Sequence, residues 1–264
     1  MKFTSIMMLA MAVASAVATG SCNESAPTDR DTASSAYERK DVAALTALAD
    51  QGDAKAQFTL GVRYVTGQGV PQDYATAASW LRKAADQGNA AAQSCLGFMY
   101  AGGKGVAQDS AAAVSWYRRA ADQGNVSAQY NLGLMYTNGQ GVAQDYAAAA
   151  SWLRKAAEQG YADAQTMLGT MYLEGKGVAQ DDAAAASWWR KAADQGHAKA
   201  QSKLGTMYFL GRGVAQDYVQ AHKWLNLGAA GGQDDSKLRD LIATLMTPDQ
   251  IAEAQRLASE WKKK

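Results

Sequence analysis

A segment of 36 residues repeats five times in this chain, and this period constrains the fold more than any other feature. A Leu-Gly pair and a tryptophan recur in every copy. The tryptophans are Trp80, Trp116, Trp152, Trp188 and Trp224, and the Leu-Gly pairs begin at Leu60, Leu96, Leu132, Leu168 and Leu204. A period of this length is typical of solenoid proteins, in which each repeat is one supersecondary unit that buries its apolar face only against its neighbours.

The copy from Asn125 to Gly160 predicts two antiparallel helices joined by a glycine-rich turn. Ala128, Leu132 and Tyr136 are four residues apart, so they share one face of the first helix. An Asn-Gly-Gln-Gly sequence follows and ends that helix, because glycine accepts the left-handed conformation of a helix end. Asp145 is the expected N-cap of the second helix, since its carboxylate can accept hydrogen bonds from first-turn amides.

Glycine inside the first helix needs a packing reason, because it costs about 1 kcal/mol relative to alanine. Gly133 is such a residue, and the small residues of both helices leave space beside it. We expect the ring of Trp152 to fill that space, and the other four tryptophans to occupy the core in the same way.

The recurring pattern is Ala-x-x-Leu-Gly-x-x-Tyr, then Gly-x-Gly-Val-x-x-Asp, then Ala-x-x-Trp-x-x-x-Ala-Ala-x-x-Gly. It resembles the Sel-1-like repeat, a relative of the tetratricopeptide repeat, over residues 53–232. The resemblance implies an all-α, right-handed superhelical solenoid of antiparallel helix pairs that holds other proteins. It implies no catalytic residues and no cofactor.

The remaining segments complete a domain plan. Thr247-Pro248-Asp249-Gln250 is a strong helix start, with a cap residue, proline at the first position and glutamine three residues after the cap. We expect helices that cover the two ends of the stack, because terminal repeats need a polar outer face. The predicted parts are a signal peptide (1–21), a disordered tether (22–35), an N-terminal capping helix (36–52), five repeats (53–88, 89–124, 125–160, 161–196 and 197–232) and C-terminal capping helices (233–264).

The N-terminal segment predicts export. The apolar run Ile6–Val17 is too short for a membrane span and follows a lysine, as in a secretory signal. Thr19-Gly20-Ser21-Cys22 resembles a bacterial lipobox, with Thr19 where a large aliphatic residue is usual. Lipidated Cys22 would tether the chain to the envelope, facing the periplasm. The alternative is ordinary cleavage after Ala16-Val17-Ala18, which would release a soluble periplasmic or secreted protein.

Several kinds of chemistry find little support in the sequence. The formal net charge is +1, which argues against nucleic acid as a partner. The Gly-x-Gly pairs follow helices rather than strands and lack the lysine-serine pair of a phosphate-binding loop, so we interpret them as turns. His197 and His222 are the only histidines and are not expected to meet. We therefore predict no metal, no cofactor and no catalytic residue.

The partner-binding prediction comes from comparing the repeats with one another. On each first helix, one face is constant and the opposite face varies and carries apolar side chains. By the family resemblance, the variable positions line the concave groove of the solenoid. The alternative is neutral drift on a solvent-facing surface. The candidate binding residues are Phe58, Val62, Phe98, Tyr130, Asn131, Leu134, Met167, Thr170, Lys203 and Phe209.

The sequence as a whole predicts a monomeric, non-enzymatic interaction scaffold that binds a peptide or protein partner in this groove, held at a membrane by its lipid. Two alternatives belong to other classes. One is an enzyme acting on cell-wall or β-lactam substrates, as proposed for some disulfide-rich relatives of the family. The other is a secreted factor that acts on another cell.

Overall fold

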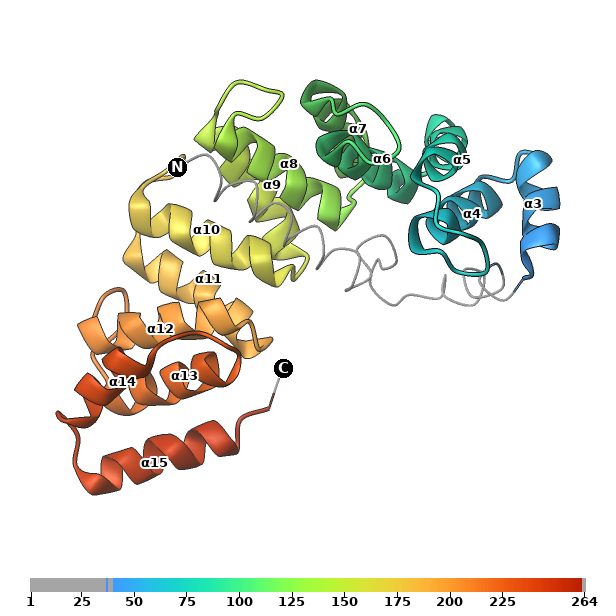
Figure 1. Cartoon of the computed structure of the whole chain (residues 1–264). Helices are drawn as coiled ribbons and strands as arrows, with labels where there is room; N and C mark the ends of the chain where they lie inside the picture. Colours follow the sequence, from blue (N-terminus) through green and yellow to red (C-terminus); the bar gives the residue numbers. More distant parts are fainter. Residues whose placement is uncertain (1–36, 38–39, 263–264) are drawn as a thin grey trace. The chain divides into compact units, whose positions relative to one another are not determined.

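The computed structural model describes residue 37 and residues 40–262. The predicted signal peptide, the tether and Cys22 lie outside these residues. The described part contains thirteen α-helices and no β-strand (Figure 1), which confirms the all-α prediction. The helices are α3 (Val42–Asp50), α4 (Ala54–Thr66), α5 (Tyr74–Asp86), α6 (Ala90–Gly102), α7 (Ser110–Asp122), α8 (Val126–Asn138), α9 (Tyr146–Glu158), α10 (Ala162–Glu174), α11 (Asp182–Asp194), α12 (Ala198–Leu210), α13 (Tyr218–Ala230), α14 (Ser236–Ala243) and α15 (Pro248–Ser259).

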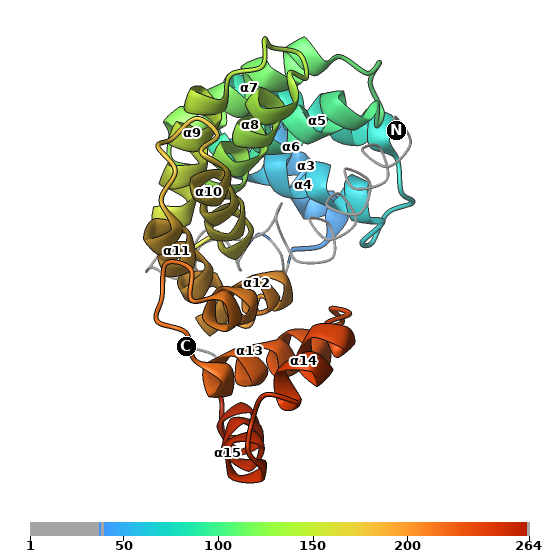
Figure 2. The same ribbon diagram turned by 90° about the vertical axis from the view of Figure 1, so that its left-hand side faces the viewer.

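The chain divides between Gln144 and Asp145 into two compact units. Unit 1 contains α3 to α8, and unit 2 contains α9 to α15. Each helix from α3 to α7, and each from α9 to α13, packs against the helix that follows it. In unit 2, α14 and α15 both pack on α13 (Figure 2). Each unit is therefore a stack of helix pairs, as expected for an all-α solenoid.

The helix ends follow from capping residues. Asn125 caps α8 by accepting a hydrogen bond from a first-turn amide, and Gly139 ends that helix in the left-handed region at φ 65°. Asp145 caps α9 by accepting from the amides of Ala147 and Ala148, both at 2.9 Å. These bonds satisfy amides that have no partner within the helix. They confirm the predicted turn and N-cap.

The C-terminal helix also starts as its sequence predicts. The Gln250 amide donates to Thr247 Oγ1 at 3.3 Å, and the Thr247 amide donates to Gln250 Oε1 at 2.9 Å. This capping box starts α15, which packs on α13. The rings of Trp261 and Trp224 meet edge to face, with centroids 6.4 Å apart. Edge-to-face packing is a favourable geometry for two aromatic rings.

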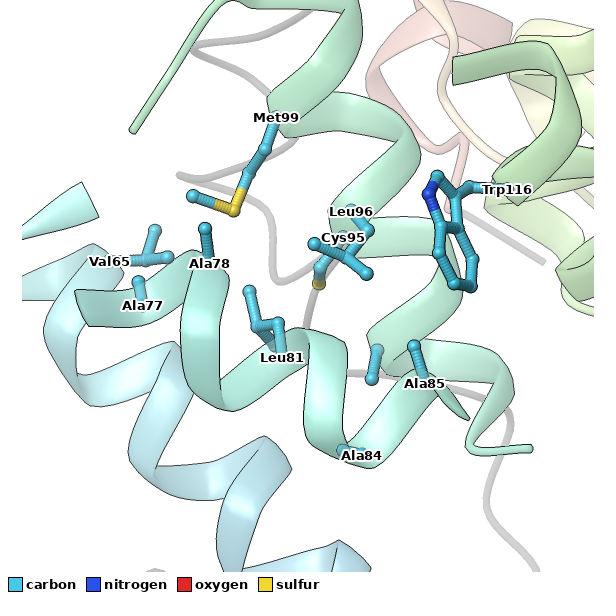
Figure 3. Packing of buried hydrophobic residues seen from close by; sticks show 11 residues of the cluster. Val65, Ala77, Ala78, Leu81, Ala84, Ala85, Cys95, Leu96, Met99 and Trp116 are labelled. Atoms are coloured by element: carbon cyan, nitrogen blue, oxygen red, sulfur yellow. The ribbon is translucent and has the colours of Figure 1, made fainter. Parts of the chain in front are cut away.

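The core of each repeat consists of leucine and alanine from both helices. The Leu-Gly leucines are at most 1% exposed. The glycine beside each leucine admits a side chain from the paired helix: a Cβ at Gly61 would lie only 2.7 Å from Leu81 Cγ. Figure 3 shows Leu81, Leu96 and Cys95 gathered in the core of unit 1. The residues that meet Gly97, Gly169 and Gly205 in the same way are Tyr117, Trp189 and Leu225.

The recurring tryptophan does not fill the space at the glycine in these four repeats, although Trp116 and Trp224 lie in the core as predicted, 8% and 1% exposed. The side chain that fills the space at the glycine comes one residue after the tryptophan, a rotation of about 100° around the helix. Trp80, Trp152 and Trp188 are only half-buried. A lysine Nζ lies close to each of these ring centroids, within cation–π distance. The pairs are Lys83 and Trp80 (3.8 Å), Lys155 and Trp152 (3.8 Å), and Lys191 and Trp188 (4.0 Å).

A recurring buried glutamine links each first helix to the helix before it. Gln57 Nε2 donates to the carbonyl oxygen of Ala49 at 2.9 Å. That carbonyl also accepts from the backbone amide of Gly52 at 3.1 Å, so the glutamine binds its second lone pair. The recurring glutamine thereby gives its own buried side-chain amide a partner. The other pairs are Gln93 with Ala85, Gln129 with Ala121, Gln165 with Ala157, and Gln201 with Ala193.

Candidate partner-binding surface

The ten predicted binding residues lie on the first helix of each repeat, namely α4, α6 and α8 in unit 1 and α10 and α12 in unit 2. Unit 1 carries Phe58, Val62, Phe98, Tyr130, Asn131 and Leu134, and unit 2 carries Met167, Thr170, Lys203 and Phe209. All ten side chains are half-buried. The apolar members are therefore less exposed than the sequence analysis expects, because their bases pack on the core. Phe58 and Phe98, for example, contact the core cluster of unit 1. Their binding role remains a prediction.

Unit 1 has a hollow in this surface between α6, α7 and α8. Asn131 and Leu134, two of the predicted residues, line it from α8. The volume of the hollow is about 60 Å³. The other lining residues are Ala101, Gln108, Ser110, Tyr117, Met135 and Gln140. The lining mixes apolar and polar side chains, and the volume is far below the roughly 300–1,000 Å³ of small-molecule pockets.

The hollow lies at two positions that differ from the neighbouring repeats, Ser110 at the start of α7 and Gln140 in the loop after α8. Gly141 lies against the Ser110 carbonyl, so the loop sits directly on that helix start. In the neighbouring repeats a longer pair occupies the same two positions. These pairs are Lys104 with Tyr74 (Nζ to ring centroid 5.3 Å), Lys176 with Tyr146 (6.0 Å), and Arg212 with Asp182 (Nε to Oδ2 2.9 Å).

The rim of the hollow offers hydrogen-bonding groups. Within the described part of the chain, the side-chain amides of Asn131 and Gln140 have no hydrogen-bond partner, although both residues are half-buried. Each amide has two donors and an acceptor oxygen. The Gln108 amide is used differently, since its Nε2 donates to the Ala101 carbonyl at 2.9 Å. The hollow therefore combines an apolar floor with two amides that can bind a partner's polar groups.

In unit 2, the distinctive member of the predicted surface is Lys203. Its Nζ lies 5.1 Å from the centroid of the Trp189 ring. Burial lowers the pKa of the Lys203 ammonium, Lys199 acts in the same direction, and Glu174 opposes them. The nearby Glu174 carboxylate is paired with Lys176 at 2.7 Å. A partly desolvated cation at this place favours partners that bring an acceptor or a negative charge.

The sequence comparison missed Ser110, Tyr117 and Gln140, because it examined only the first helices. A signal was nevertheless present. Ser110 stands where three other repeats have tyrosine, and Tyr117 stands where the others have leucine or tryptophan. Such departures from the repeat pattern at paired positions mark the place where the packing between repeats changes.

The described residues contain no group of three or more His, Cys, Asp or Glu side chains placed to hold a metal ion. The two histidines have other contacts. His197 Nε2 lies 3.1 Å from Asp163 Oδ1, and His222 Nδ1 lies 3.0 Å from Asn226 Nδ2. None of the helices in the described part has the length and hydropathy of a bilayer-spanning segment.

The stacked helix pairs, with a recurring leucine and alanine core and varied residues on the first helices, define an α-helical repeat scaffold. Five consecutive matches to the Sel1 repeat model cover residues 54–89, 90–125, 126–161, 162–197 and 198–233. The chain therefore belongs to the Sel1 repeat family, as the sequence pattern predicts. Sel1 repeat proteins generally mediate protein–protein interaction, and their fold is generally a non-enzymatic scaffold.

Two solved structures show the same fold. The crystal structure of a protective antigen present in uropathogenic Escherichia coli strains, which displays an SLR fold, is 41% identical with a TM-score of 0.74 over 82% of this chain and 48% of that one. A Sel1 repeat protein from Oxalobacter formigenes is 39% identical with a TM-score of 0.68 over 76% and 58%. This chain therefore spans about half the length of these relatives. A search of curated proteins found no match.

Proposed function

We propose that this chain is a non-enzymatic, monomeric scaffold that binds a segment of another protein on the variable faces of its first helices. The observation that carries the proposal is the hollow between α6, α7 and α8. Asn131 and Leu134, chosen from the sequence for their variability, line it together. The interaction role that is general in the family supports the same conclusion.

The local chemistry favours a segment that is largely uncharged. Helices α6 and α8 contain no charged residue. The half-buried side chains on this face include Phe98, Tyr130 and Leu134. Aromatic and aliphatic side chains in fixed positions, with free amides beside them, resemble the apolar centre of protein interfaces. In unit 2, Lys203 adds one cation that suits an acidic residue of the partner.

A single charge introduced into the hollow tests the proposal. Peptides that bind the full chain are first selected from a displayed library of random peptides. We expect Leu134→Glu to weaken binding of a selected peptide at least about 10-fold, because a carboxylate in the apolar floor must be desolvated when the peptide docks. Fluorescence anisotropy with the labelled peptide gives the affinities, and circular dichroism checks that helicity is unchanged.

The matched control is Ser79→Glu. Ser79 is exposed on the second helix α5, so the same charge placed there leaves the first-helix face intact. Its affinity for the peptide is expected to stay within about 2-fold of the wild-type value. Equal binding by wild type and Leu134→Glu would reject the first-helix face as the binding surface.

We also propose that Cys22 carries a lipid that tethers the scaffold to the bacterial envelope, facing the periplasm. The small residues before Cys22 and the preceding apolar run support this. A fatty-acid label supplied to growing cells should appear in the wild-type chain and be absent from Cys22→Ser. Equal labelling of both chains, or none in either, would leave the ordinary secretory signal as the better account.

A further inference from the structure

The hollow beside Ser110 lies where other repeats place a tyrosine ring. Tyr74, Tyr146 and Tyr218 occupy the equivalent position in three repeats. The Tyr74 ring packs against the core cluster of unit 1, and the Tyr218 ring lies 6.1 Å from that of Phe209, centroid to centroid. Ser110 supplies no ring. The helices α7 and α8 therefore leave a space open at the position where three other repeats place the phenol ring of their own tyrosine.

The walls of this space suit an aromatic side chain. Tyr117 and Met135 are buried, and Leu134 is half-buried beside them. A tyrosine ring, a thioether and a leucine all make favourable contacts with an incoming ring. At the rim, the unpartnered amides of Asn131 and Gln140 can donate to a phenol oxygen or accept from its hydroxyl hydrogen.

We infer that the hollow between α7 and α8 binds an aromatic side chain of the partner segment, with tyrosine preferred, in the place of the ring that Ser110 lacks. This inference rests on the proposed function and names the residue type that the partner contributes. Aromatic side chains that enter a pocket are typical anchors of protein interfaces, because one ring buries a large area at a low cost in rotamer freedom.

The decisive variant is Ser110→Tyr, which restores the residue of the neighbouring repeats and fills the hollow from within. Because tyrosine already stands at three equivalent positions, we expect a thermal midpoint no lower than that of the wild type. The control is Ser115→Tyr, on the same helix but exposed, which adds the same ring without reaching the hollow.

The experiment selects random displayed peptides on the full wild-type chain, without selection against Ser110→Tyr, and takes those that lose affinity for Leu134→Glu. We expect these peptides to share a tyrosine or phenylalanine. A synthetic peptide from this set should bind Ser110→Tyr at least about 10-fold more weakly than wild type, and Ser115→Tyr equally well. Replacing the peptide's aromatic residue by alanine should cost about 10-fold on wild type but under about 2-fold on Ser110→Tyr.

A second measurement is independent of peptide selection. The compound p-cresol, which is the side chain of tyrosine as a free molecule, is titrated into the full chain. Methyl resonances of Leu134 and Met135 should shift in the wild type and stay in place in Ser110→Tyr. No shift in the wild type, or the same shift in both proteins, would overturn the inference.

The outcomes also separate the inference from the proposed function. Peptides that lose affinity for Leu134→Glu but not for Ser110→Tyr would leave the binding face in place and overturn the aromatic anchor. Peptides that lack an aromatic residue would overturn it as well. Binding that neither substitution affects would reject both proposals.

Discussion

Gly105→Ala is expected to lower the free energy of unfolding by about 2–5 kcal/mol. Gly105 has φ +69°, where alanine costs about 1–2 kcal/mol. A Cβ there would also overlap the carbonyl oxygen of Tyr74, the first residue of the second helix in the preceding repeat. Backbone atoms cannot move aside as a flexible side chain can, so overpacking adds about 1–3 kcal/mol. Denaturant unfolding of the full chain measures the difference.

Gly88→Ala is the matched control. Gly88 has φ +88°, but no atom lies within 4 Å of an added Cβ. Alanine at this position should lower the free energy of unfolding by only about 1–2 kcal/mol, which is the cost of placing a Cβ in the left-handed conformation. The comparison separates close approach between repeats from turn geometry. Equal costs at the two glycines would mean that the loop does not pack on the preceding repeat.

The second large effect is expected at Leu81, which is 0% exposed and fills the space beside Gly61. Leu81→Ala should cost about 2–5 kcal/mol, because it removes buried methyl groups and leaves a cavity. Trp80→Ala should cost less, about 1–2 kcal/mol, since the half-buried ring loses only partial burial and its contact with Lys83.

The fifth repeat provides a contrast for the same measurement. Trp224 is 1% exposed and packs against Trp261 of α15. Trp224→Ala should therefore cost about 3–5 kcal/mol, unlike Trp80→Ala. Thermal and urea unfolding of the full chain give the ranking. A larger loss for Trp80→Ala than for Leu81→Ala would restore the tryptophan as the residue that holds the repeat together.

The period, the helix pairs and their caps could be predicted because they depend on local chemistry. A side chain such as Asp145 can cap a helix whatever surrounds it, and glycine ends a helix for reasons of its own backbone. The capping box of Thr247 and Gln250 was visible for the same reason.

The role of the tryptophan could not be predicted, because the sequence shows that the helix glycine needs a neighbouring side chain but not which of two adjacent residues supplies it. The residue that meets the helix glycine varies, from Leu81 to Tyr117 to Trp189. Several shapes can fill that space if the neighbouring side chains adapt, so a buried position can vary as much as a surface position does. Only the rotation of the helix in the folded unit shows which of two adjacent residues points inward.

Two of the predicted binding residues, Asn131 and Leu134, line the hollow, and their binding role stays a prediction. The hollow itself depends on Ser110 and Gln140, which are 30 residues apart and meet only because the repeats stack. A sequence comparison position by position does not examine such pairs. The three other pairs each join a cation to a ring or a carboxylate, and Ser110 with Gln140 does neither.

The central claim is that partners bind the first-helix face, and photo-crosslinking in cells that express the chain tests it most directly. A benzophenone amino acid replaces Leu134 in one full-length variant and Ser79 in another. We expect irradiation to attach a partner protein through position 134 and none through position 79. Crosslinking through position 79 alone, or equally through both positions, would contradict the claim.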